Sequence, residues 1–380
     1  MARLGDVCTI VSGRTPKSNV PEYWGGDVNW ITPAEISEES YIIYDTVRHI
    51  TELGVTRTGL KPFPKGTVIL SSRAPIGKTA IAGCEMYCNQ GFKNLICSEK
   101  IDPRYLYWFL TCNTKYLNSL GRGATFKEIS KEIVANIEIP LPKKEVQIIV
   151  AKKFEKLIDL VSLRKQQLAK LDELVKSRFV ELFGDQETNP YNLNAGKLSD
   201  VADIYLGLTH TPTYVEQGRP FLSVRDISSG VIDFSNCHYI TEEEFNSLPN
   251  GARPQVGDML FCRVGTIGKP VIIPENTPEF GTFVSVGYLR KKANVNNYYL
   301  KSWMENDYFM RQVYDNVAGA SQINLNTGWL KNFRILIPPM KLQEQFAAFV
   351  EQTDKSKLAI QQSLQKLETL KKALMQQYFG

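Results

Sequence analysis

The sequence predicts an α+β protein of two similar halves, each with a mixed α/β domain followed by one long helix. Three observations support this prediction: an internal repeat, short strand-like segments between turn residues, and two apolar ladders with coiled-coil spacing. With 380 residues, the chain is long enough for two or three domains with ordinary cores. Its 43% hydrophobic and 22% charged residues are typical of a soluble globular protein.

The internal repeat sets the organisation of the chain. Residues 123–184 align without a gap with residues 319–380, and 16 of the 62 positions are identical, where unrelated segments would share roughly 4. Near the start of each half, "RLGDVCTIVSGRTP" resembles "KLSDVADIYLGLTHTP", and further on "GTVILSSRAPIGK" aligns with "GDMLFCRVGTIGK". We therefore expect four consecutive segments. They are a domain at 1–142, a helix at 143–184, a domain at 185–338 and a helix at 339–380.

The two mixed domains contain strand and helix signals in alternation. The segments "TVILSS", "DMLFC", "PVIIP" and "FVSVGYLR" are rich in β-branched and aromatic residues between Gly, Pro and Asn, which predicts strands. The segments "DPRYLYWFLTCNTKYLNSL" and "NNYYLKSWMENDYFMRQVYDN" carry aromatic residues at helical spacing. Core packing is the simplest role for such aromatic faces.

Each half ends in a ladder of apolar residues spaced alternately by three and four. The first ladder consists of Val150, Phe154, Leu157, Val161, Leu168, Leu171, Val175 and Leu182, with Arg164 and Arg178 on two further rungs. The second consists of Phe346, Val350, Ile360, Leu364, Leu367, Leu374 and Tyr378. This spacing predicts two coiled-coil helices, each starting after a proline. A helix of about 40 residues is about 60 Å long and cannot bury a one-sided stripe alone. We therefore expect the two helices to pair. An antiparallel pair would place one mixed domain near each end, but the pattern leaves the direction open.

Cysteine usage and hydropathy indicate a cytoplasmic chain. The seven cysteines are unevenly spread, and neither a secretory leader nor an apolar run of about 20 residues is present. Cys84 and Cys88 have no second pair at zinc-ligand spacing. The net charge of +5 permits binding to a polyanion without requiring it.

The stretch "SSRAPIGKTA" resembles a phosphate-binding loop but lacks its requirements. Ser72 stands where the first glycine belongs, and Arg263 stands there in the second copy. Lys269 is followed by Pro270, which has no hydroxyl for magnesium, and strand-like segments follow where a helix is needed. We expect "IGK" to be a turn that presents a lysine. With three histidines and no H-E-x-x-H or G-x-S-x-G motif, the chain is not expected to be an enzyme.

Three polar loops recur at equivalent places in both halves. "SGRTPKS" matches "GLTHTPT", "SSRAPIGK" matches "CRVGTIGK", and "GRGATFKEIS" matches "AGASQINLN". Arg and Lys beside Gly and Ser/Thr suit phosphate contacts, whereas Gln, Asn and His suit base edges. The candidate DNA-binding residues are Arg14, Thr15, Lys17, Ser18, Arg73, Lys78, Arg122, Thr125, Lys127, Thr209, His210, Thr211, Thr213, Arg263, Lys269, Ser321, Gln322 and Asn324.

Taken in order, these motifs resemble the specificity subunit of a type I restriction–modification system. The resemblance rests on the two "LG/SDV…G…TP" starts and the two "IGK" turns. It also rests on the junctions "GRGATFKEIS…IEIPLPKKEVQ" and "AGASQINLN…ILIPPMKLQEQF" and on the helix ends "ELFG" and "QYFG". It covers essentially the whole chain. Lys143 and Lys144 depart from the Pro-rich junction that this family often has, which concerns the angle at the first junction.

The resemblance implies two target recognition domains, each reading one half of a bipartite site on double-stranded DNA. It implies that the helices act as a spacer and dock two modification subunits. Those partners would carry S-adenosylmethionine and methylate adenine N6, so that this chain binds no cofactor and is not an enzyme. A restriction subunit that translocates DNA is left open, and no membrane is involved.

The two half-sites are expected to differ. Arg14, Lys17 and Arg122 are replaced in the other copy by Leu208, Thr211 and Ala318, which predicts an asymmetric split sequence. Two alternatives stay open: a coiled-coil scaffold that binds proteins but not DNA, and a degenerate enzyme. A steep fall of affinity with salt distinguishes DNA binding from the scaffold.

Overall fold

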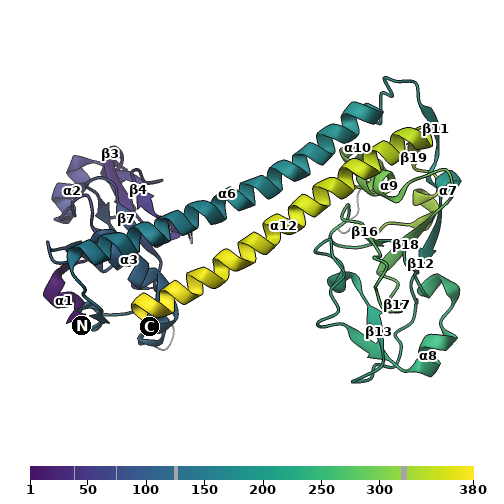
Figure 1. The fold of residues 1–380 in the computed structure, drawn as a ribbon. Coiled ribbons are helices and arrows are strands. Elements are labelled where there is room, and N and C mark those ends of the chain that lie inside the picture. Colours follow the sequence, from purple (N-terminus) through teal and green to yellow (C-terminus); the bar gives the residue numbers. More distant parts are fainter. Residues whose placement is uncertain (38, 74, 124–126, 318–322) are drawn as a thin grey trace. The chain divides into compact units, whose positions relative to one another are not determined.

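The structure is a computed structural model that describes residues 1–37, 39–73, 75–123, 127–317 and 323–380. The chain forms two compact units, in agreement with the repeat. Unit 1 consists of Met1–Arg164 with Gln362–Gly380, and unit 2 consists of Lys165–Gln361. Each unit therefore holds one mixed domain and one end of each long helix, α6 (Lys144–Phe183) and α12 (Met340–Phe379) (Figure 1).

The core of unit 1 is built on two sheets. The larger has the order β2 (Cys8–Val11), β9 (Asn94–Cys97), β6 (Val68–Leu70), β7 (Thr79–Ala82) and β4 (Ile42–Ile43). The smaller has the order β5 (His49–Ile50), β3 (Trp24–Ile31) and β8 (Tyr87–Cys88). The central strands β6 and β7 are buried along their whole length. The predicted strand "TVILSS" therefore lies in the core.

Short helices surround the sheets of unit 1. The aromatic segment forms α3 (Pro103–Cys112) and α4 (Thr114–Ser119), and the α3 aromatics Tyr105, Tyr107, Trp108 and Phe109 are buried, as predicted. The other elements are β1 (Ala2–Arg3), α1 (Leu4–Val7), the 3-10 turns η1 (Pro21–Tyr23) and η2 (Pro33–Glu35), α2 (Glu52–Thr58), α5 (Lys131–Ala135) and β10 (Glu138–Ile139). β1 and β10 pair as a two-stranded ribbon.

Unit 2 has the same plan. Its four-stranded sheet has the order β12 (Ala202–Leu206), β18 (Val286–Lys291), β15 (Met259–Cys262) and β16 (Val271–Ile272). Its three-stranded sheet has the order β14 (His238–Ile240), β13 (Arg219–Leu222) and β17 (Gly281–Thr282). Around them lie β11 (Asn194–Lys197) paired with β19 (Arg334–Ile337), α7 (Leu198–Val201), η3 (Val224–Asp226), α8 (Glu242–Ser247), η4 (Asn250–Ala252), α9 (Asn297–Met304), α10 (Asp307–Asn316) and α11 (Thr327–Leu330).

One predicted strand is wrong in extent. The segment "FVSVGYLR" was expected to be a single strand, but β18 begins only at Val286, and residues 283–285 link it to β17. The reason is that the backbone N–H of Phe283 donates to Leu222 O of one sheet, whereas Val286 already pairs with Cys262 in the other. The link between the two sheets becomes part of the candidate site.

The long helices are antiparallel within each unit, which settles the direction that the sequence left open. In unit 1, Phe379 near the end of α12 stacks on Phe154 near the start of α6, with ring centroids 5.7 Å apart. The same phenylalanine packs against Tyr105 of α3. In unit 2, Phe346 near the start of α12 packs against Phe179 near the end of α6.

A buried glutamine joins the start of each long helix to its mixed domain. Gln343 Oε1 accepts the backbone N–H of Asn296 (2.8 Å), and its Nε2 donates to Pro338 O (2.8 Å) and Asn294 O (3.3 Å). Gln147 makes the matching three bonds in unit 1, to the Asp102 N–H and to the carbonyls of Lys100 and Pro142. Both side chains are fully buried. These paired positions in the repeat therefore hold the same structural joint.

All seven cysteines are free thiols. In the described part of the chain, no helix combines the length and apolarity needed to cross a membrane.

Candidate nucleic-acid interface

The predicted site residues of unit 1 lie on three loops: loop A (residues 12–18), loop B (71–78) and loop C (121–130). Loops A and B contact one short link, residues 88–91 at the end of β8, which we name link 1, and loop C bonds to loop B. The sequence had placed the loops far apart along the chain. In the folded unit they lie close together, because link 1 at the end of β8 contacts both loop A and loop B.

Loop A is held through its backbone and leaves its charged side chains exposed. The indole N–H groups of Trp30 and Trp24 donate to Arg14 O (3.1 Å) and Lys17 O (3.2 Å). Gly13 passes so close to link 1 that a Cβ would lie 1.7 Å from Cys88 O, so only glycine fits there. Arg14, Lys17 and the neighbouring Thr15 and Ser18 are exposed. The loop therefore presents cations and hydroxyls on a fixed backbone.

Loop B is joined both to link 1 and to loop C. The Ser72 N–H donates to Gly91 O (2.7 Å), and Ser72 O accepts from the Ile129 N–H (2.9 Å). Arg73 and Glu128 face each other as an isolated antiparallel bridge, with Nη1 and Oε2 of their side chains 3.8 Å apart. The contacts fix the position of Arg73 beside link 1.

The "IGK" motif of loop B is a turn between β6 and β7, as predicted. Gly77 has a φ of 92°, which L side chains rarely adopt. Lys78 is half-buried, and its Nζ donates to Pro33 O at 3.0 Å. This lysine is therefore partly engaged inside unit 1.

Sequence reasoning missed the polar residues of link 1. Asn89 Oδ1 accepts the Gly91 N–H (2.9 Å), and Gln90 Oε1 accepts from the Thr15 hydroxyl (2.6 Å). Gln90 is exposed and Asn89 is half-buried. A usable signal was present, because "NQG" puts two amides directly between a strand and a glycine.

A concave surface of about 470 Å³ opens where these pieces meet. It is lined by Thr32, Pro33, Ala34, Arg73, Asn89, Gly91 and Glu128. Glu128 Oε1 also accepts from Lys93 Nζ at 3.0 Å, so two cations face one carboxylate. The charged residues that line the surface are Arg73 and Glu128, and Arg73 and the Asn89 amide supply hydrogen-bond donors.

Unit 2 repeats this arrangement with loop A′ (residues 207–213), loop B′ (262–269), the described part of loop C′ (323–326) and link 2 (282–285). Gly207 passes close to the carbonyls of Thr282 and Phe283, just as Gly13 passes Cys88. Thr209, His210, Thr211 and Thr213 of loop A′ are exposed, and so is Asn324 of loop C′. Thr213 also donates its backbone N–H to Glu244 Oε1 (3.1 Å).

Arg263 of loop B′ braces the loops of unit 2 against one another. Its guanidinium donates to Leu325 O (3.0 Å), Val284 O (3.0 Å) and Asn324 Oδ1 (3.3 Å). Burial lowers the pKa of this guanidinium. The three bonds hold loop B′, loop C′ and link 2 together, so Arg263 positions the candidate interface from within.

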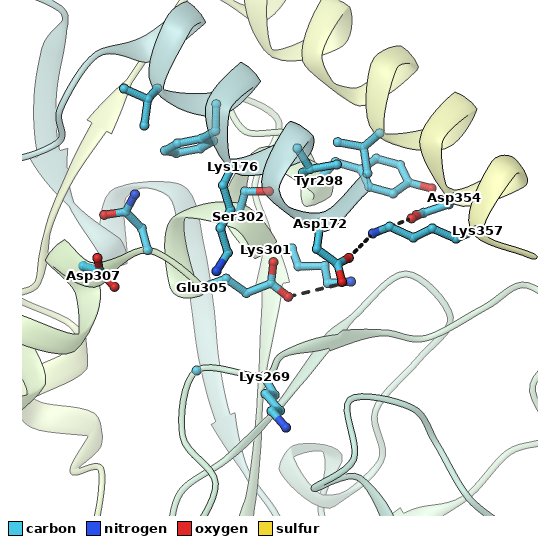
Figure 2. A pocket seen from close by; sticks show the side chains of 16 residues that line it. Asp172, Lys176, Lys269, Tyr298, Lys301, Ser302, Glu305, Asp307, Asp354 and Lys357 are labelled. Atoms are coloured by element: carbon cyan, nitrogen blue, oxygen red, sulfur yellow. Dashed lines mark ion pairs between the residues drawn. The ribbon is translucent and has the colours of Figure 1, made fainter. Parts of the chain in front are cut away.

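Lys269 lies elsewhere in unit 2, beside α6, α9 and α12. It lines a cavity of about 540 Å³ together with both acidic and basic side chains (Figure 2). Lys357 pairs there with Asp172 (2.6 Å) and Asp354 (3.6 Å), which are shown as dashed lines in Figure 2. Lys269, the last residue of loop B′, therefore borders the long helices.

The remaining predicted residues divide into two groups. Arg122 and Lys127 of loop C are exposed. Thr125, Ser321 and Gln322 lie outside the described residues. Within the described ranges, no cluster of His, Cys, Asp and Glu could hold a metal ion. The loops of unit 1 present cations, amides and hydroxyls, and those of unit 2 present hydroxyls, an imidazole and an amide. Such groups suit contacts with phosphates and base edges.

Comparisons with known proteins match the chain along nearly its whole length. A family model described as "Type I restriction modification DNA specificity domain" matches residues 1–173 and again residues 194–372. The type I restriction enzyme MjaIX specificity subunit of Methanocaldococcus jannaschii is 27% identical over 98% of this chain and 90% of its own length. The MjaVIII specificity subunit of the same organism is 22% identical over 72% of this chain and 69% of its own.

Two solved structures share the fold. A chain from a structure on complex assembly and conformational transition of the type I R-M system aligns with a TM-score of 0.64 at 20% identity. That alignment covers 100% of this chain and 96% of the other. The S subunit of a type I restriction–modification system from M. genitalium aligns with a TM-score of 0.57 at 15% identity, covering 100% and 95%.

Proposed function

Since this chain belongs to the family of type I restriction modification DNA specificity domains, we propose that it is the specificity subunit of a type I restriction–modification complex. Each unit reads one half of a bipartite site on double-stranded DNA. The observation that carries the proposal is the duplicated site. Loops A and B contact link 1 and loop C pairs with loop B, and their counterparts are joined in the same way around link 2, with different exposed side chains.

The chemistry of the loops supports DNA as the ligand. Arg14 and Lys17 are exposed cations beside hydroxyls, which suits phosphate contacts that position a protein on the duplex. Link 1 adds amide donors next to Arg73, and such groups distinguish bases in the major groove. Because the exposed residues differ between the units, the two half-sites differ in sequence.

The long helices serve as spacer and docking surface. Apolar side chains on α6 and α12 stay exposed, among them Ile149, Leu163, Leu174, Leu358 and Leu370. Two modification subunits cover such residues in the assembled complex, and those subunits carry S-adenosylmethionine and perform the adenine methylation. This chain supplies specificity without catalysis, and the complex works in the cytoplasm, with or without a restriction subunit.

Salt dependence of DNA binding tests this function against the protein scaffold. Anisotropy of a labelled mixed-sequence duplex is measured with the full chain between about 50 and 200 mM salt, where each phosphate contact adds about 0.9 to the slope of log affinity against log salt. The double variant R14A/K17A is expected to reduce the slope by about 2. The control variant K366A removes an exposed lysine of α12 and leaves the slope unchanged. An affinity for DNA that does not change with salt concentration would favour the protein-binding scaffold.

A further inference from the structure

Backbone hydrogen bonds define which residues of the two links are equivalent. The Asn89 N–H donates to Ile31 O in unit 1. The Phe283 N–H donates to Leu222 O in unit 2, and Leu222 occupies the place of Ile31 in the parallel strand pair. Asn89 therefore corresponds to Phe283.

The far ends of the links agree with this register. Gly91 O accepts from the Ser72 N–H (2.7 Å), and Ser285 O accepts from the Arg263 N–H (3.0 Å). The residue in between is Gln90 in link 1 and Val284 in link 2.

Loop B follows the same register. Arg73 forms an isolated antiparallel bridge with Glu128, and Val264 forms one with Asn324. Arg73 thus corresponds to Val264. At three equivalent positions, unit 1 has Arg73, Asn89 and Gln90, whereas unit 2 has the half-buried Val264, Phe283 and Val284. One side of Phe283 packs against the core cluster that contains Leu208 and Phe221.

The amide of Asn89 is oriented as a donor. Its Oδ1 accepts the Gly91 N–H, so Nδ2 points the other way and has no partner among the described residues. Gln90 Oε1 is likewise engaged, by Thr15. The Arg73 side chain is 37% exposed, and Lys93 shares the carboxylate of Glu128 that faces it. All three side chains can therefore give hydrogen bonds to a ligand.

We propose that Arg73, Asn89 and Gln90 read guanine in the first half-site, and that Val264, Phe283 and Val284 read thymine in the second. Guanine presents two acceptors in the major groove, O6 and N7, which match donors; thymine presents a methyl group, which matches apolar side chains. This inference rests on the proposed function and assigns the base chemistry of each half-site. The brace from Arg263 to Val284 O fixes link 2 for that contact.

The variant N89D isolates the donor role from the structural role. Aspartate keeps the oxygen that accepts the Gly91 N–H but replaces the amide NH₂ with a second acceptor. A purely structural Asn89 would tolerate the change. If Asn89 reads guanine, the N89D variant should lose the preference for guanine. Its preference should shift toward cytosine, whose N4 is a donor.

The test is selection of binding sites from a randomised duplex library by the full chain with its modification subunits, for wild type, N89D and F283S. Wild type is expected to select guanine in one half-site and thymine in the other. N89D should lower the guanine preference by about tenfold to hundredfold and leave the other half-site unchanged. F283S should lower the thymine preference in the second half-site and leave the first half-site unchanged. F283L, which stays apolar, should retain the thymine preference.

Base analogues give a second readout on the selected sequence. Replacing the selected guanine by 7-deazaguanine removes N7, and replacing thymine by uracil removes the methyl group. Both base analogues should weaken DNA binding by the wild-type chain. The affinity of N89D should not change when 7-deazaguanine replaces guanine. If N89D and wild type select the same first half-site, the base assignment is wrong although the proposed function stands. If the wild-type complex selects no sequence, the proposed function itself fails.

Discussion

Replacement of Gln343 by alanine is expected to lower the free energy of unfolding of unit 2 by about 3 kcal/mol. The side chain is fully buried and makes three hydrogen bonds, to the Asn296 N–H and to the carbonyls of Pro338 and Asn294. Alanine leaves the half-buried Asn296 N–H without its acceptor, which costs about 1–3 kcal/mol. Loss of the side-chain stem and the resulting cavity add about 1 kcal/mol.

Urea unfolding of the full chain measures this loss, with Q352A as the matched control. Gln352 is an exposed glutamine on the same helix, so its replacement should change the stability by less than about 0.5 kcal/mol. Hydrogen exchange at the Asn296 amide should also accelerate in Q343A, because that N–H loses its acceptor. Q343E should be worse than Q343A at pH 7, because a carboxylate would face two carbonyl oxygens, and it should recover in acid as the carboxyl becomes protonated. If Q343A were as stable as Q352A, the buried joint would not hold the helix to its domain.

Three further changes test other parts of the structure. R263A should reduce stability by about 2 kcal/mol in urea unfolding, because three acceptors lose their donor. R263K should not restore this stability. Full stability in R263A would show that Arg263 does not hold loop B′, loop C′ and link 2 together. F379A should reduce the stability of unit 1 by about 3 kcal/mol, since Phe379 is buried against three aromatic rings. L370A, at an exposed site of α12, should have little effect. Equal losses of stability in the two variants would refute the antiparallel contact. Burial would raise the pKa of Asp102, but hydrogen bonds from the Arg104 side chain and N–H outweigh it and hold this pKa below its usual value. The stabilising contribution of the Asp102 carboxylate should be complete above the unfolded pKa of about 3.9 and disappear as the pH falls through the lowered folded pKa. Acid titration should therefore destabilise wild type more steeply than D102N. Parallel curves of stability against pH for the two proteins would contradict this.

Much of the fold could be predicted from sequence because the repeat and the apolar ladders are local patterns. The direction of helix pairing could not, since an apolar seam fits a partner of either direction. It depends instead on single contacts, such as Phe379 on Phe154, that join residues far apart in the chain. The split of "FVSVGYLR" was also hidden, because a three-residue link between two sheets has the same composition as a strand.

The candidate site was predictable as a set of loops but not residue by residue. Arg14 and Lys17 are exposed as expected, because polar loop tips rarely bury cations. Arg263 has the same residue type, yet its guanidinium turns inward to carbonyls that only the folded chain brings near. Asn89 was missed since its neighbours in the site come from loops A and B rather than from adjacent sequence.

Mapping of N6-methyladenine in DNA from cells that express this chain with its modification subunits tests the central claim most directly. We expect one split motif, in which a fixed number of unspecified bases separates two different short sequences. Replacement of link 1 residues should alter only one of the two. A palindromic or uninterrupted motif would contradict the assignment of two unlike reading units to one chain.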